Sequence, residues 1–285
     1  MRRALVALAL PLAAVALAAP LAAQQVPDPA LIAARAAWER HPENVDSIVW
    51  YGRRIGYTGD FAHAVALYTE GLRRHPDEPH LLRHRGHRYL SLRRFDLAIA
   101  DLARAQVVVA GQPDEVEPDG QPNARGVPTS SLHSNIRYHL ALAYFVTGDF
   151  RAAEPIWAED VRLARNLDTR VAATYWWVLT LASLGRHEQA RRVLADVRPD
   201  WDVIENGSYH RLLLWMRGDL PESALLGPDA PTLERQTVGN GVGQWHAANG
   251  RSAEARAAWE RVLALGSSAA FGVIAAEQGL ARLGR

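Results

Sequence analysis

The sequence contains a motif that recurs about every 34 residues. Each copy has a glycine or a short polar turn, usually an aromatic or apolar residue two places later, and in most copies an alanine three places after that. The copies begin at Gly59, Arg93, Gly148, Gly185, Gly218 and Gly250. This pattern predicts that one helix ends at the turn and a second begins just after it, with alanine allowing the two to approach closely. One pair cannot bury its apolar face alone, so the period predicts stacked helix pairs.

The spacing of turn, aromatic residue and alanine resembles that of the tetratricopeptide repeat (TPR) family. The family pattern fits residues 45–78 and 79–112 well, and it fits the copies at Gly148 and Gly185 adequately. The last two copies follow shorter intervals of 33 and 32 residues. The resemblance implies an all-α fold, a right-handed superhelical α-solenoid of about six TPR helix pairs. The phase extends upstream and downstream of these copies, which predicts a capping helix at each end.

Residues 1–23 have the three parts of a secretory signal: two arginines, an alanine-rich apolar stretch, and small residues near Ala23. We expect this segment to be cleaved, which leaves residues 24–285 as a single TPR-like solenoid domain. The mature protein is then expected to be periplasmic or extracellular and not stably inserted in a membrane. The alternative is that the segment is retained as a membrane anchor. The chain has no cysteine, which excludes disulfides and thiolate metal sites. Loss of the two arginines changes the net charge from +1 to −1, which argues against general nucleic-acid binding.

One interval between copies is too long. Arg93 and Gly148 lie 55 residues apart, which is 34 plus 21, so a loop is inserted near 113–133. Its acidic, proline-rich and glycine-rich composition is typical of an irregular segment. One hypothesis is that this loop folds over the concave face and pairs with Arg83, Arg85 or Arg88; the alternative is a solvated, disordered loop. Its candidate ligand-binding residues are Glu117, Asp119 and Asn123.

The resemblance implies that the first helix of each pair lines a concave groove. The sixth places of these helices are mostly aromatic or imidazole: Trp50, His84, His139, Trp176, Tyr209 and Gly241. Broad aromatic surface left in water normally marks a binding site, although some of these rings can instead pack between repeats. The predicted ligand-binding residues of the groove are Trp50, Arg53, Arg83, His84, His87, Asn135, Tyr138, His139, Tyr175, Trp176, Glu205 and Tyr209.

These residues favour a TPR-type binding module in the cell envelope that recognises a peptide or a small polar or aromatic ligand. One alternative is an enzyme whose histidine and carboxylate groups meet under the inserted loop; the candidates are His84, His87, His139, Glu117, Asp119, Glu205 and His210. Another alternative is a protein–protein scaffold. No cofactor is expected. Nor is a metal site, because the arginines that flank the His84–His87 pair oppose a cation and no third ligand is near in sequence.

Overall fold

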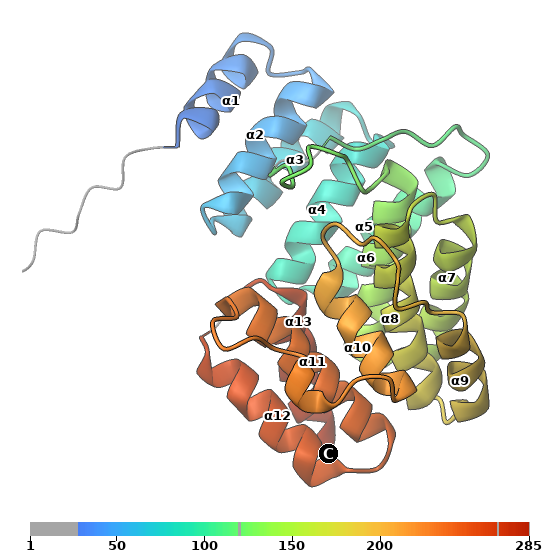
Figure 1. Cartoon of the computed structure of the whole chain (residues 1–285). Helices are drawn as coiled ribbons and strands as arrows, with labels where there is room; N and C mark the ends of the chain where they lie inside the picture. Colours follow the sequence, from blue (N-terminus) through green and yellow to red (C-terminus); the bar gives the residue numbers. More distant parts are fainter. Residues whose placement is uncertain (1–27, 119–120, 267, 285) are drawn as a thin grey trace, which may run out of the picture.

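The computed structural model describes residues 28–118, 121–266 and 268–284, and within them the chain is all-α (Figure 1). The segment 1–23 expected to be a signal lies outside the described residues. No described helix is both long and apolar enough to cross a lipid bilayer. The helices are α1 (Pro29–Arg40), α2 (Val45–Tyr57), α3 (Phe61–Arg74), α4 (Pro79–Ser91), α5 (Phe95–Val108), α6 (Leu132–Thr147), α7 (Phe150–Leu163), α8 (Leu167–Ser183), α9 (His187–Ala195), α10 (Gly207–Arg217), α11 (Thr232–Ala248), α12 (Ser252–Ala264) and α13 (Phe271–Leu283), with a 3-10 turn, η1 (Glu222–Ala224), between α10 and α11.

The predicted array of helix pairs is confirmed. Helices α2 and α3, α4 and α5, α6 and α7, and α8 and α9 pack as successive pairs, and α1 caps the first of them. The glycines of the motif end the first helix of each pair in the left-handed region, for example Gly148 at φ 87°. The motif alanines are fully or almost fully buried, which is what close approach of two helices requires: Ala64, Ala98, Ala153, Ala190 and Ala255.

The fifth unit is shorter than the others. Its first helix is α10, but the position of a second helix holds only the single turn η1. Helix α11 therefore reaches back to contact α8 as well as α10 and its own partner α12. The degenerate intervals after Gly185 reflect this missing helix.

The last helix, α13, closes the array. It packs on α11 and α12 and also contacts α6, far away in sequence. Arg93 donates two hydrogen bonds of 2.9 Å to the carboxylate of Glu277 on α13, and a third to the carbonyl oxygen of Ser268. Arg93 occupies the motif position that glycine fills elsewhere and has a φ of 58°, a conformation that is costly for a side chain other than glycine. The second repeat thus accepts backbone strain at the residue that holds the C-terminal helix.

The inserted loop runs from residue 109 to 131, between α5 and α6, and its described part crosses the array (Figure 1). Near α6 it forms an isolated antiparallel bridge between Val116 and Ser131. Ser131 also caps α6, and its hydroxyl donates to Asp114 over 2.7 Å. Both ends of the loop are therefore fixed to the start of the same helix.

Candidate functional site

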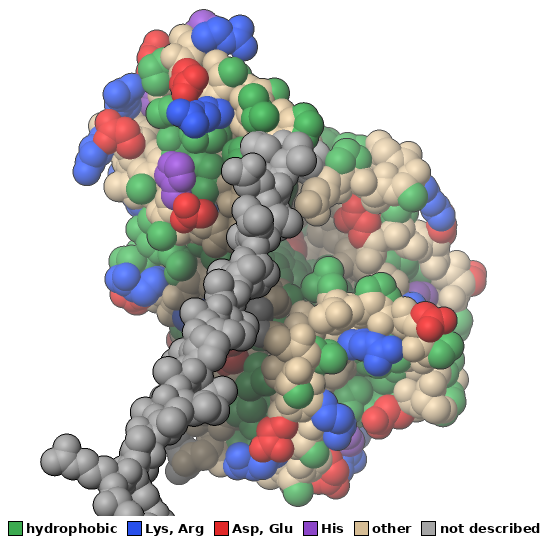
Figure 2. Space-filling model, turned by 90° about the vertical axis from the view of Figure 1, so that its left-hand side faces the viewer, with side chains coloured by type: hydrophobic (Ala, Val, Ile, Leu, Met, Phe, Trp, Pro, Cys, Tyr) green, Lys and Arg blue, Asp and Glu red, His purple; other side chains and the backbone are tan. Residues whose placement is uncertain are grey.

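The concave side of the array contains two adjoining cavities. Their volumes are about 290 and 760 Å³, and four residues line both of them: His87, Glu205, Asn206 and Phe271. Figure 2 shows the surface hollowed between the upper, N-terminal helices and the lower, C-terminal helices. The shared lining residues come from α4, from the segment that leads into α10, and from α13. The hollow therefore exists only because α13 returns to the middle of the array.

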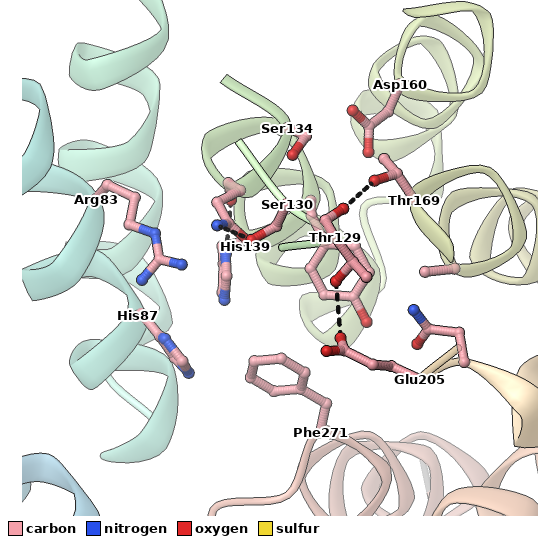
Figure 3. Close-up of a pocket in the computed structure, with 14 residues that line it drawn as sticks. Arg83, His87, Thr129, Ser130, Ser134, His139, Asp160, Thr169, Glu205 and Phe271 are labelled. Carbon is pink, nitrogen blue, oxygen red and sulfur yellow. Dashed lines mark hydrogen bonds between the residues drawn. The ribbon is translucent and has the colours of Figure 1, made fainter. Parts of the chain in front are cut away.

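The smaller cavity is built around a cluster of rings (Figure 3). The rings of His87 and His139 lie 4.4 Å apart, and Phe271 lies 5.4 Å from the first and 5.5 Å from the second. Tyr138 meets His139 edge to face at 5.5 Å. The backbone carbonyl of Asn135 lies 2.6 Å from Nδ1 of His139 and fixes its ring. Helices α4, α6 and α13 thus present flat rings to one space.

The two imidazoles of this cluster are uncharged at neutral pH. Burial lowers the pKa of His139 to about 3, and the positive charge of Arg83 acts in the same direction. Burial also lowers the pKa of His87 well below its ordinary value, helped by Arg88 and by His139 itself. Neutral imidazoles accept and donate hydrogen bonds without attracting a counter-ion. This wall of the cavity suits a polar or aromatic ligand group.

A carboxyl group on the opposite wall is also perturbed. Asp160 is 1% exposed and accepts a 2.8 Å hydrogen bond from Nε of Arg137, while its Oδ2 has no hydrogen-bond partner. Burial raises the pKa of Asp160 to about 6, although Arg137 opposes that change. The pair joins α6 to α7 and lies at the edge of the cavity (Figure 3).

The inserted loop docks onto α4 through Glu117, which is only 5% exposed. Its carboxylate lies 3.2 Å from Nε of Arg83 and 2.8 Å from Nε2 of His84, and it accepts a hydrogen bond from Asn135. Of the three arginines proposed as partners of the loop, Arg83 is the one it meets. Arg85 forms a two-pronged pair with Asp101 instead.

Electrostatics favour this docking. Burial by itself raises the pKa of Glu117, but the charge of Arg83 and the contacts with His84 and Asn135 outweigh it and hold that pKa well below the usual range. Burial and Arg83 also lower the pKa of His84 to about 3, so its imidazole is uncharged. The loop is therefore held by a Glu117 carboxylate on an Arg83 guanidinium, both screened from water.

The far side of the loop is fixed to the segment before α10. Asn123 donates to Glu205 over 2.7 Å, and Arg125 donates two 2.7 Å hydrogen bonds to Asp202. Thr129 donates to the other oxygen of Glu205, as Figure 3 shows. On the near side, Arg53 donates to the carbonyl oxygen of Pro118. The loop therefore bridges α2 and α4 to the segment between α9 and α10, and it narrows the hollow.

The structure brings about half of the predicted groove residues to the hollow. These are Arg83, His87, Asn135, Tyr138, His139, Glu205 and Tyr209. Of the predicted loop residues, Glu117 and Asn123 hold the loop in place, and Asp119 lies outside the described residues. Arg53 acts through the loop rather than at either cavity.

Other predicted groove residues are corrected by their burial. Tyr175 and Trp176 are 0% exposed and line neither cavity, because α11 packs directly on α8 where the fifth unit lacks a helix. The Trp176 indole stacks near Trp157 and donates to the hydroxyl of Tyr138 over 2.9 Å. Trp50 lies under Arg53, with 4.7 Å from the guanidinium to the ring centre, and outside both cavities.

Two candidate catalytic histidines have structural contacts instead. The His84 ring is buried against Glu117 and Tyr68 and lines neither cavity. His210 is 8% exposed, stacks on Trp201 and contacts the carbonyl oxygen of Arg198 at 2.8 Å. Neither is placed to touch a ligand in the hollow.

Sequence reasoning missed several lining residues. Phe271 lies at the start of the C-terminal capping helix, and nothing in the repeat phase places it against His87. Other missed residues come from the loop, from the start of α6, from α7, from the start of α8 and from the segment before α10: Thr129, Ser130, Ser134, Asp160, Thr169 and Asn206. The turn-rich loop was the one available signal, because it pointed to a segment that could reach the groove. Among the described residues, no group of three histidine or acidic side chains is arranged to hold a metal ion.

Comparison with known proteins finds no relative in sequence and several solved structures of low similarity. No family model matches the chain, and no curated protein matches it. YrrB, described as a TPR protein with an unusual peptide-binding site, overlaps 87% of this chain and 100% of its own at 13% identity and a TM-score of 0.47. A TPR protein from Parabacteroides merdae overlaps 88% and 91% at 14% identity and a TM-score of 0.48. The Naa15/Naa10 complex with HypK-THB overlaps 87% and 36% at 16% identity and a TM-score of 0.39.

The architecture is TPR-like. This description rests on the chain's own helix pairs, on their 34-residue phase and on the buried motif alanines.

Proposed function

We propose that the protein is a TPR-type binding module of the cell envelope, which takes a peptide segment or a small polar or aromatic ligand in the hollow beneath the inserted loop. The observation that carries the proposal is the combination of a docked loop with two adjoining cavities. Binding sites are typically concave, mostly apolar, and equipped with a few fixed polar groups. The ring cluster provides the apolar walls, and Asn135, Glu205 and Asn206 provide the polar groups.

The preorganised loop supports binding rather than an open scaffold surface. A ligand that meets a site already held by Glu117 and Asn123 has little backbone ordering to induce. A long partner helix would instead need the loop to move away from α4. A small ligand or a short peptide segment therefore fits the narrowed hollow best.

A pair of serine-to-tryptophan variants tests this proposal. Ser208 lines the larger cavity, so the indole of Ser208→Trp would fill space that the ligand needs. Ser252 is exposed at the start of α12, and Ser252→Trp is the matched control. Peptide and small-molecule collections are screened by thermal shift against the wild type, and affinities of the ligands found are measured for all three proteins.

We expect Ser208→Trp to weaken the ligands by about tenfold or more, which corresponds to about 1.4 kcal/mol, and Ser252→Trp to leave them unchanged. Ligands that bind all three proteins equally would contradict the proposal, provided that both variants unfold at the temperature of the wild type.

Export is a separate part of the proposal and rests on the sequence of residues 1–23 alone. Expression of the full chain in a Gram-negative host should give a periplasmic protein whose first residue, read by mass spectrometry, is Gln24 or a neighbour. A cytoplasmic protein that retains Met1 would contradict export without affecting the binding proposal.

A further inference from the structure

The larger cavity is lined by a cation that no described carboxylate neutralises. Arg88 projects from α4 into this cavity, and no aspartate or glutamate of the described residues lies within ion-pair distance of its guanidinium. The other two arginines of the same helix are paired, Arg83 with Glu117 and Arg85 with Asp101. Arg88 therefore differs from its neighbours in that no carboxylate of the described residues compensates its charge.

The position of Arg88 is specified by its surroundings. A Cβ atom at Gly56 would lie only 2.6 Å from Nη1 of Arg88, so the absence of a side chain there lets the guanidinium lie across α2. The group lies 5.5 Å from the ring centre of Phe61. Its Nη2 lies 2.8 and 2.9 Å from the two ring nitrogens of His87. These contacts fix the guanidinium without neutralising it, because His87 is uncharged.

Arg88 keeps its charge at neutral pH although its environment opposes it. Burial lowers its pKa to about 10; the charges of Arg83 and Arg53 contribute to this fall, and the neighbouring tyrosines oppose it. Among the described residues, the array places three guanidiniums around this point, those of Arg53, Arg83 and Arg88, with the carboxylate of Glu117. The local field is positive, and it opens into a cavity.

Of the other described acidic groups that line the larger cavity, Glu234 has a cationic partner, whereas Glu205 has uncharged ones. Glu205 accepts hydrogen bonds from Asn123 and Thr129 of the inserted loop. Glu234 pairs with Arg211. Glu205 lies just before α10 and Glu234 lies in α11, whereas Arg88 lies in α4. An anionic group therefore has one favourable position in this cavity, on the α4 wall.

The rest of the cavity wall is largely apolar. Rings and aliphatic groups from four parts of the chain line it: Tyr57, Phe61, Tyr209, Pro231, Leu233 and Phe271. A ligand that fills this space buries an apolar or aromatic body next to the cation.

We propose that Arg88 is the anchor for the anionic group of the ligand, a carboxylate or a phosphate, and that the body of this ligand is apolar or aromatic. The inference rests on the proposed function and names the ligand class. A guanidinium offers parallel N–H donors that match the oxygens of either anion. A partly desolvated cation that has no anionic partner among the described residues gains more from such an anion than a solvated surface arginine does.

The experiment compares three small probes that share an aromatic body: 3-phenylpropanoate, phenyl phosphate and the uncharged 3-phenylpropanamide. Each is titrated by calorimetry into the wild type, into Arg88→Gln and into the control Arg94→Gln. Arg94 is exposed at the start of α5, and its side chain makes no capping hydrogen bond. The melting temperature of each protein without ligand is measured in parallel.

We expect at least one anion to bind the wild type about tenfold more tightly than the amide. Arg88→Gln should abolish this preference and leave the amide affinity unchanged, and Arg94→Gln should keep the preference. Whichever of the two anions shows the larger preference identifies the anionic group. The melting temperature of free Arg88→Gln should equal or exceed that of the wild type, since the substitution removes an unpaired cation; a purely structural role would lower it.

The inference is overturned if neither anion binds the wild type more tightly than the amide, or if the preference survives in Arg88→Gln. Binding of the amide alone would contradict the anionic class while leaving the proposed binding function intact. Loss of all binding in Ser208→Trp concerns the proposed function and not this inference.

Discussion

Removal of the Glu117 charge should release the inserted loop and destabilise the protein. In Glu117→Gln the side chain keeps its shape and can still accept from Asn135, but Arg83, 7% exposed, becomes a buried cation without a partner. Breaking a buried pair from one side costs about 3–5 kcal/mol, and the retained hydrogen bond favours the lower end, about 3 kcal/mol. For a chain of this size that corresponds to a fall in melting temperature of about 6–12 °C.

The matched control is Glu115→Gln. Glu115 lies in the same loop and contacts His80, but its side chain is 60% exposed, so we expect a change within about 0.5 kcal/mol. Urea denaturation measures both free energies of unfolding. Trypsin reports the loop directly, because Arg125 is the single basic residue of the segment 109–131 and its cleavage should accelerate in Glu117→Gln.

The pH dependence gives a second check on the same pair. The pKa of Glu117 is lowered in the folded protein, so its contribution is complete above the ordinary value of 4.5 and is lost progressively as the pH falls below it. The difference between wild type and Glu117→Gln should therefore narrow in acid. Equal stabilities of Glu117→Gln and Glu115→Gln at neutral pH would refute the claim that a buried charge pair holds the loop.

Three further outcomes are expected. The free energy of unfolding should fall as the pH drops from 6.5 towards about 5, by up to about 1.4 kcal/mol per pH unit for each buried imidazole, because the unfolded chain takes up protons that the folded chain excludes. In urea denaturation, His139→Gln should reduce the slope of this pH dependence. A wild-type stability that does not change with pH would contradict this expectation. Gly243→Ala should destabilise the protein by about 1–3 kcal/mol, since the new Cβ atom would lie 2.4 Å from a tryptophan ring. The control Gly227→Ala should leave stability unchanged, because no atom lies within 4 Å of its Cβ position. Equal melting temperatures of the two variants would count against close packing of α11. Glu277→Gln should speed hydrogen exchange of the α13 amides, and the control Glu260→Gln, at an exposed residue, should leave it unchanged. Equal exchange rates in the two variants would disprove that the Arg93–Glu277 pair holds α13 on the second repeat.

The helix pairs could be predicted from the sequence because their signals are local. Turn glycines such as Gly59 and Gly148 take the positive φ that the motif requires, and an alanine buried between two helices identifies each pair. Even Arg93 takes the backbone conformation that its place in the phase implies. The 34-residue period does not indicate that Glu277 of α13 is the partner of Arg93.

The candidate site was predictable only where a single helix sets the direction of a side chain. His87, Tyr138 and His139 follow from the position of first helices in the array. Phe271 does not, because its place depends on the return of α13. Tyr175 and Trp176 were predicted to line the groove but are buried, because the fifth unit lacks a second helix and α11 therefore packs on α8. Both outcomes depend on contacts between units that are distant in sequence, and a repeat period carries no information about those.

Closure by α13 also links the number of repeats to the size of the hollow. An open array tolerates the gain or loss of a pair, since each unit contacts only its neighbours. Here, one extra pair between α6 and α11 would carry Glu277 away from Arg93 and withdraw Phe271 from the hollow. At a constant number of helices, the shape of the hollow therefore changes through substitutions in its walls and in the inserted loop.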